Sequence, residues 1–327
     1  MNRIELAPAT LINVVSGIPS EILRRQETES AYGYIYSMDP VEADWHVAID
    51  ITEQLELPNH SSRCIFVAAE PPEIRRYDPA VLSKYGTVLS APFRYLGRLP
   101  NLHPASGLLP WRVGLGIENG YPRVNLSRRD LEYLEPPTSE SISVVTSQKA
   151  YTRLQVKRLK LIEYLAARIP ELEVFGRDTR PIDDKAEALR RGRYHIALEN
   201  CAQTGFWTEK LSDPILMENV TFYSGRNRWQ SDFAGEGAII EIDVSRREGA
   251  YESIRRTLDS NSYEASRKAL IANKRAVLEK LNLQTTIEQV INRSNGPQAG
   301  TRQGRTALPR HRTRREQWRT KPWPISP

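Results

Sequence analysis

Polar side chains between Arg193 and Gly225 have types and spacings that suit an anionic ligand. In order along the chain they are Glu199, Asn200, Thr208, Glu209 and Lys210. Thr208 is expected to cap a helix whose first turn carries the carboxylate and the lysine. Free backbone N–H groups of such a turn attract negative charge, and a lysine adds a full positive charge. We predict that these residues form one half of an active site. The plainer alternative is that they are a strand end and a helix cap with no role in chemistry.

Glu70 is the candidate for a general base, and it lies much earlier in the chain. It follows the apolar run Cys64 to Ala69, and the prolines Pro71 and Pro72 direct the chain after it away from helix. A carboxylate held at such a rigid turn can take a proton from a hydroxyl group. Glu73 is the competing carboxylate, and a glutamate before proline is also a common feature of ordinary loops.

Parallel sheets are needed to bring these residues to one edge, because ligands of such sheets bind outside the carboxyl ends of the strands. In the first half the chain predicts strands and helices at Ser20–Gln26, Tyr32–Tyr36, Trp45–Ile49, Cys64–Ala69, Asp78–Lys84 and Tyr85–Leu89. A second β/α series is predicted at Ser141–Thr146, Leu154–Ile169, Leu172–Phe175, Asp183–Arg191, Tyr194–Leu198 and Ala238–Ile242. The fold class is therefore α/β, with two doubly wound domains.

Three regions follow from this order of elements. We expect an amino-terminal domain over residues 1–137, a carboxyl-terminal domain over 138–290 and a basic tail over 291–327, with the linker at Glu135–Glu140. The helices predicted at Tyr263–Leu281 and Thr285–Arg293 could pack back on the first domain or form a dimer. Residues 92–137 are rich in proline, glycine and aromatic side chains, which is typical of a functional loop region.

A family resemblance rests on the residues around the first candidate site. A strand ending in Glu199-Asn200, a spacer with an aromatic residue, Thr208-Glu209-Lys210 and a second strand ending in Gly225 resemble the donor-binding signature of glycosyltransferase family 10, the α-1,3/4-fucosyltransferases. The resemblance implies a GT-B fold, in which two Rossmann-like domains face a cleft. It also implies an inverting enzyme that moves L-fucose from GDP-fucose to a hydroxyl of an N-acetylglucosamine-containing glycan, with no required cofactor or metal.

The resemblance also assigns roles to individual residues. Glu70 matches the base, and Glu209 is the carboxylate beside the reacting sugar, with Glu199 as its alternative. Arg158 matches the arginine that contacts the diphosphate, although Arg153 lies nearer the start of the same helix. An equally good interpretation is that these basic residues form only a solvated helix face. The remaining donor-binding residues are Gly176, Glu199, Asn200, Thr208, Lys210 and Tyr223. The implied partners are a GDP-sugar donor and an oligosaccharide or lipid-linked glycan acceptor.

Two departures from the family pattern concern the geometry of the donor site. Pro214 falls inside the helix expected after Thr208, at a cost of about 3 kcal/mol, so we expect the helix to restart with Asp213 as its N-cap. Thr221 stands where the family has a proline. The alternatives are a transferase for another nucleotide sugar and an inactive carbohydrate- or lipid-binding relative.

Composition sets the broad class of the protein. The 327 residues are 39% hydrophobic and 26% charged, and no apolar run is long enough for a membrane span. The amino terminus makes a poor signal peptide, so we expect a cytoplasmic protein. Cys64 and Cys201 are expected to be buried free thiols. The pair Asp183-Asp184 suits a helix cap better than a metal site.

Positive charge is concentrated in the tail. Residues 291–327 hold nine Lys or Arg against one Glu, a net charge of +8, so the first 290 residues carry −2. Such an acidic body argues against nucleic-acid binding. The arginines, with Trp318 and Trp323, would suit an anionic membrane surface at the inner face of the membrane, while a solvated tail without a role is the alternative.

Overall fold

A computed structural model describes residues 10–25, 30, 32–39, 41–51, 61–201, 203–225, 229–260 and 262–294. The basic tail beyond residue 294 and residues 1–9 lie outside the described residues, so the predictions made for them stay predictions. Within the described part of the chain, no helix has the length and apolar character needed to cross a bilayer.

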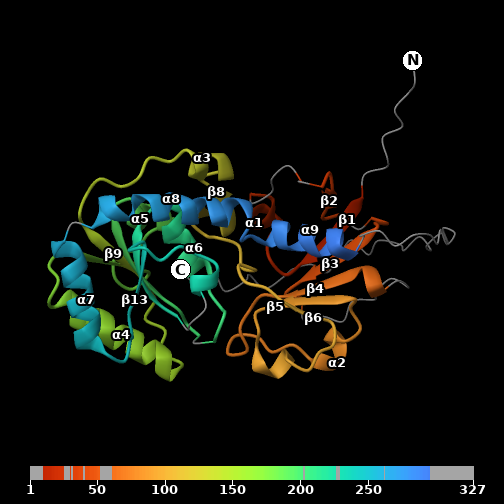
Figure 1. The fold of residues 1–327 in the computed structure, drawn as a ribbon, viewed down its shortest axis with the longest axis horizontal. Helices are drawn as coiled ribbons and strands as arrows, with labels where there is room; N and C mark the ends of the chain where they lie inside the picture. The colour runs from red at the N-terminus through yellow and green to blue at the C-terminus, as the bar shows by residue number, and fades with distance from the viewer. Residues whose placement is uncertain are drawn as a thin grey trace, which may run out of the picture.

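Two parallel sheets form the framework of the protein (Figure 1). The first sheet has the order β2-β1-β3-β4-β5-β6, with strands β1 (Leu11–Ser16), β2 (Ile35–Ser37), β3 (Trp45–Ile49), β4 (Cys64–Ala68), β5 (Thr87–Ser90) and β6 (Leu102–Pro104). The second has the order β10-β9-β11-β12-β13, with β9 (Ile142–Val145), β10 (Leu172–Phe175), β11 (Tyr194–Leu198), β12 (Val220–Ser224) and β13 (Ile239–Glu241). The expectation of two α/β series is confirmed, and we call the parts that carry these sheets the first and second halves.

Helices cover both sheets. Their bounds are α1 (Ser20–Arg24), α2 (Pro79–Leu82), α3 (Arg128–Glu132), α4 (Arg153–Ala166), α5 (Lys185–Leu189), α6 (Glu209–Leu216), α7 (Arg247–Asp259), α8 (Tyr263–Glu279) and α9 (Leu283–Ser294). A short antiparallel hairpin, β7 (Leu115–Glu118) and β8 (Tyr121–Val124), stands apart from the two sheets.

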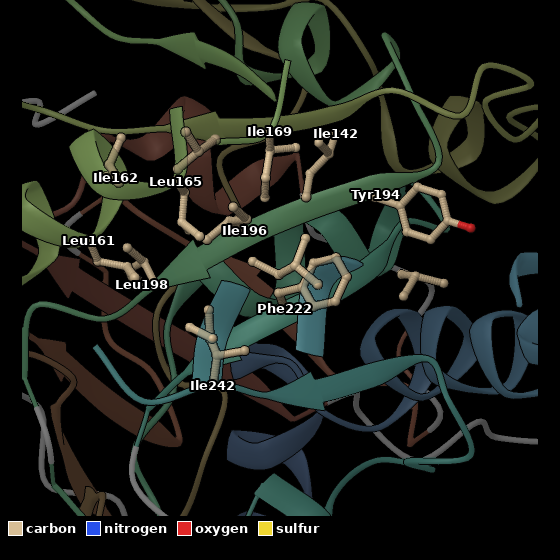
Figure 2. Close-up of a cluster of buried hydrophobic side chains, with 14 of the residues drawn as sticks. Ile142, Leu161, Ile162, Leu165, Ile169, Tyr194, Ile196, Leu198, Phe222 and Ile242 are labelled. Atoms are coloured by element: carbon tan, nitrogen blue, oxygen red, sulfur yellow. The ribbon is translucent and has the colours of Figure 1, made fainter. Parts of the chain in front are cut away.

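Strand β11 shows why the second half is stable. Its residues alternate between two cores: Tyr194, Ile196 and Leu198 join α4, α7 and α8 on one face, and Ala197 joins α5 and α6 on the other. Figure 2 shows Leu161 and Leu165 of α4 beside this strand. Each fully buried Leu or Ile contributes about 2 kcal/mol, so a strand buried on both faces is firmly held at the centre of its sheet.

Helix α9 returns to the first half. Leu283, Ile287 and Val290 are buried with strand residues such as Val47 of β3 and Ile65 of β4. Of the two alternatives left by the sequence, packing back on the first sheet is the one observed for α9. In Figure 1 this helix lies across β1 and β3, whereas α8 lies over the second half.

The chain between the sheets packs on the second half. Trp111 is only 2% exposed, and Trp111, Val113 and Leu131 share a core with α5 and α6 of the second half. Trp111 of this loop region is therefore a packed core residue. We call residues 111–131 the connecting segment, because it leaves the first sheet and packs on the second half.

Helix α6 also differs from the prediction. It runs through Pro214 without a restart, and Asp213 caps nothing. The side chain of Asp213 instead accepts the backbone N–H groups of Arg112 at 2.7 Å and Val113 at 3.0 Å. Pro214 has no backbone N–H to donate to the Lys210 carbonyl oxygen. Burial of Leu211 and Ile215 offsets the loss of this hydrogen bond.

Candidate active site

Glu199 anchors the loop that follows β11. Its side chain is 2% exposed and accepts the Thr208 backbone N–H at 2.9 Å, the Thr208 hydroxyl at 2.9 Å and the Tyr223 hydroxyl at 3.2 Å. Burial raises the pKa of Glu199, and the charge of Lys210 opposes that rise. The structure therefore brings three of the predicted donor-binding residues together, with their polar groups directed at one another.

The first turn of α6 carries a cluster of charges. Thr208 caps the helix by accepting the Lys210 backbone N–H at 3.2 Å. Glu209 forms ion pairs with Lys210 at 2.8 Å and with Lys185 at 3.8 Å. Burial alone would raise the pKa of Glu209, but Lys210 and Lys185 hold it well below its usual range. Glu209 is therefore an anion and Lys210 a cation at neutral pH.

Arg158 reaches this cluster from α4. It is 6% exposed, on the buried face of the helix, and it donates to the side-chain oxygen of Asn200. Its Nε has no hydrogen-bond partner among the described residues. Burial lowers the pKa of Arg158, while Glu199 and Glu209 raise it. Arg153 is exposed at the start of the same helix, so the buried arginine is the better placed of the two.

A small cavity of about 50 Å³ lies between these residues. Its walls include the basic side chains of Lys149, Arg158, Lys185 and Lys210 and the acidic side chains of Glu209 and Asp213. Because one water needs about 10–15 Å³ of such space, the cavity suits a few waters or one oxyanion. With four basic groups against two acidic ones, its electrostatics favour an anion.

A larger cavity of about 220 Å³ adjoins it and shares the wall residues Val145 and Lys185. Gly176 lines this second cavity, together with apolar side chains from both halves such as Ile22 and Ile182. Gly176 has a φ of +148°, and a Cβ there would lie 1.8 Å from the Thr146 carbonyl oxygen. Close approach of two strand ends is therefore what requires glycine at this position.

Glu70 faces the start of α6 from the first half. Burial, followed by the negative charges of Asp50 and Glu209, raises the pKa of Glu70 to about 7, and Lys210 opposes this rise. These charges can act on Glu70 only because the turn after β4 lies near the first turn of α6. A carboxyl group that titrates near neutral pH is suited to general base catalysis.

Glu73, the competing carboxylate, is engaged elsewhere. It accepts the Cys201 thiol at 3.1 Å and the Gln203 side-chain amide at 2.9 Å. Burial and the neighbouring Glu73 raise the pKa of Cys201, so the thiol keeps its proton and remains a donor. Both cysteines are buried thiols outside any disulfide, as expected.

Three residues of the site were missed by sequence reasoning. Lys185 donates to Asp213 at 2.8 Å, and Asp213 is 1% exposed. Asp50 directly follows β3, and Glu70 lies two residues after the end of β4, so the place of Asp50 after a buried strand was a usable signal. Lys185 and Asp213 carried no such signal, because their pairing depends on how α5 and α6 pack.

The helix cap at Asp184 is confirmed. It accepts the Ala186 backbone N–H at 2.8 Å and also that of Gly114 at 2.8 Å, in the connecting segment. Asp183 accepts the Ile117 backbone N–H at 2.8 Å. Among the described residues, no group of three or more His, Cys, Asp or Glu is arranged to hold a metal ion.

Comparison with known proteins gives structural neighbours only. No family model matches the chain, and no curated protein matches it. Similar solved structures include an α1,3-fucosyltransferase with GDP-fucose, which is 12% identical over 86% of this chain and 94% of that chain, with a TM-score of 0.46. Another is a glycosyltransferase from Rickettsia africae ESF-5, 10% identical over 87% of this chain and 97% of that chain, with a TM-score of 0.47. TarM is 8% identical over 87% of this chain and 54% of that chain, with a TM-score of 0.48. Likenesses this weak carry no argument about donor, acceptor or mechanism.

Proposed function

We propose that the protein is an inverting GT-B glycosyltransferase that moves a sugar from a nucleoside diphosphate to a hydroxyl group. The observation that carries the proposal is that Glu70 lies near Glu209 and Lys210, two residues that line a cavity rich in basic groups. A base on one side and an anion site on the other are the two parts that such a transfer needs.

The small cavity is the proposed site for one phosphoryl group of the diphosphate. Lys210, the free Nε of Arg158 and the amino end of α6 supply positive charge there. Charge builds on the diphosphate as its bond to the sugar breaks, so these groups stabilise the transition state more than the bound donor. No metal ion is required in this proposal.

The larger cavity is the proposed site for the nucleoside. Its apolar walls suit a flat base, and it adjoins the small cavity at Val145 and Lys185. Glu209 would then lie beside the sugar, where an anion offsets the positive, oxocarbenium-like charge of the transition state. Glu199 and Tyr223 act indirectly in this proposal, by holding the loop before Thr208.

Glu70 is the proposed base. Its pKa of about 7, raised mainly by burial, lets it accept a proton from an acceptor hydroxyl at neutral pH. Attack from the side of Glu70, opposite the departing diphosphate, is a single displacement and inverts the anomeric centre. For the donor we propose GDP-fucose, and for the acceptor an N-acetylglucosamine-containing glycan, on the motif around Glu199 and Thr208.

Calorimetric titration with GDP, UDP and GDP-fucose tests the donor. We expect GDP and GDP-fucose to bind at least about tenfold more tightly than UDP, a difference of about 1.4 kcal/mol. Tighter binding of UDP would contradict the fucose donor and leave a transferase for another nucleotide sugar. Failure of all three to bind would contradict the transferase itself.

A further inference from the structure

Asp50 is a buried carboxylate beside the proposed base, and neither the family motif nor the donor site uses it. It directly follows β3, which is hydrogen-bonded to β4, and its side chain is 1% exposed. Its φ of +50° is uncommon outside glycine, although aspartate tolerates it better than most residues. A buried charge in such a backbone conformation needs strong local partners.

Those partners lie in the turn that carries Glu70. The Ala69 backbone N–H donates to Oδ1 of Asp50 at 3.0 Å, and the Tyr77 hydroxyl donates to the same oxygen. Arg75 donates to the Asp50 carbonyl oxygen. One residue therefore ties down both ends of the turn over residues 69–77, and Glu70 lies between these ties.

Asp50 also acts on Glu70 through its charge. The charged groups that face Glu70 are Asp50 from the end of β3, Glu209 and Lys210 from α6, and Arg75 from its own turn. The two carboxylates raise the pKa of Glu70 and the two cations lower it. Burial raises the pKa of Asp50, while its hydrogen bonds from Tyr77 and Ala69 favour its charged form.

We propose that Asp50 is a positioning residue for the transfer reaction, holding the Glu70 turn against α6 and supplying a second carboxylate that keeps Glu70 a good base. This inference rests on the proposed function. The two carboxyl groups titrate as a coupled pair, so removing one charge must move the apparent pKa of the pair. A residue that only supported the turn would leave that value in place.

Asp50→Asn is the principal test, since the amide oxygen still accepts the Ala69 and Tyr77 hydrogen bonds while the charge is lost. The matched control is Asp78→Asn, which also converts a carboxylate to an amide but sits at the exposed cap of α2. The pH dependence of kcat, the Kd for GDP and the carbon-13 titration of the Glu70 carboxyl group are measured for each protein. Glu70→Gln assigns the carboxyl signal.

In Asp50→Asn we expect the acidic limb of the kcat profile and the Glu70 titration to move about one pH unit lower. Because a base with a lower pKa is weaker, kcat at high pH should fall at least about threefold. The Kd for GDP should stay within about twofold, and Asp78→Asn should leave every value unchanged. A pH limb that stays in place in Asp50→Asn would overturn the inference while leaving the proposed function intact.

Two further outcomes keep the test decisive. If the native protein transfers no sugar but the Glu70 signal still shifts in Asp50→Asn, the carboxylate pair stands and the proposed function fails. If Asp50→Asn does not fold, Tyr77→Phe removes one donor to Asp50, which raises the pKa of Asp50 and reduces its negative charge, so the limb should move in the same direction by less. An unmoved limb in Tyr77→Phe would then overturn the inference.

Discussion

Glu73 of the first half accepts a hydrogen bond from the Cys201 thiol of the second half, with 3.1 Å between oxygen and sulfur. The contact joins the turn after β4 to the loop after β11. Glu70 lies three residues before Glu73, and Asn200 directly precedes Cys201. Together with the hydrogen bond from the Gln203 side-chain amide to Glu73, this contact holds the proposed base near the proposed donor site.

Glu73→Ala should loosen that junction. Hydrogen bonds to a charged group contribute about 1.5–3 kcal/mol, so we expect the free energy of unfolding to fall by about 2 kcal/mol. Amide hydrogen exchange should also speed up in the turn over residues 70–77. Cys201→Ser keeps a donor and should cost less than Cys201→Ala. Equal stability of Glu73→Ala and the native protein in urea unfolding would argue against the contact.

Glu70→Gln should change how stability depends on pH. The pKa of Glu70 is raised to about 7, mainly by burial, so the folded protein binds a proton more tightly than the unfolded chain. Its contribution is fully present below about pH 4.5 and is lost as the pH rises through 7. Glutamine does not titrate, so the variant should gain about 3 kcal/mol relative to the native protein between pH 4 and 8. Urea unfolding at both pH values checks this. If the two proteins differ in free energy of unfolding by the same amount at pH 4 and at pH 8, the raised pKa of Glu70 is contradicted.

Arg158→Gln should weaken diphosphate binding. A buried guanidinium with a free Nε is expected to contribute about 1.5–3 kcal/mol to binding an anion, so the Kd for GDP should rise about 10- to 100-fold. Arg153→Gln, at an exposed position on the same helix, is the matched control and should change the Kd less than about twofold. Calorimetry measures both, and equal effects would favour long-range charge over direct contact.

Gly176→Ala should destabilise the second half. The new Cβ would lie 1.8 Å from the Thr146 carbonyl oxygen, and a φ of +148° disfavours any side chain. We expect a loss of at least about 2 kcal/mol in the free energy of unfolding. Gly97→Ala is the control, because its Cβ would meet only the Arg94 carbonyl oxygen at 3.4 Å. A loss at Gly176 no larger than at Gly97 would contradict the close approach of β9 and β10.

Local patterns in the sequence were sufficient for the central strands. β3, β10 and β11 occupy the predicted ranges, because short apolar runs bounded by polar residues are typical of buried strands in an α/β protein. Strand β1 was not predicted, although it lies next to β3 in the first sheet. Its run Leu11–Ser16 is interrupted by Asn13, whose side chain is buried and donates to the Asp39 carbonyl oxygen at 2.6 Å. A buried polar residue with a hydrogen-bond partner therefore interrupts the apolar pattern of a strand but leaves the strand itself intact.

Long-range packing accounts for the other differences. The connecting segment has no clear period, and its place on the second half is set by distant carboxylates such as Asp213, which accepts two of its backbone N–H groups. The Asp213 side chain was expected to cap a new helix at Pro214. It binds the connecting segment instead, and α6 continues through Pro214. Asp50 differs from these cases, because its position after β3 was visible in the sequence and was overlooked.

The assignment of Glu70 as base is tested most directly by the transfer rate of Glu70→Gln. The assay uses GDP-fucose with an N-acetyllactosamine-type acceptor at neutral pH, and the Kd for GDP is measured on the same proteins. We expect the native protein to form the fucosylated product and the variant to lose about 10²- to 10⁴-fold in kcat, with the Kd unchanged within about twofold. A variant that transfers fucose at the native rate would contradict the assignment.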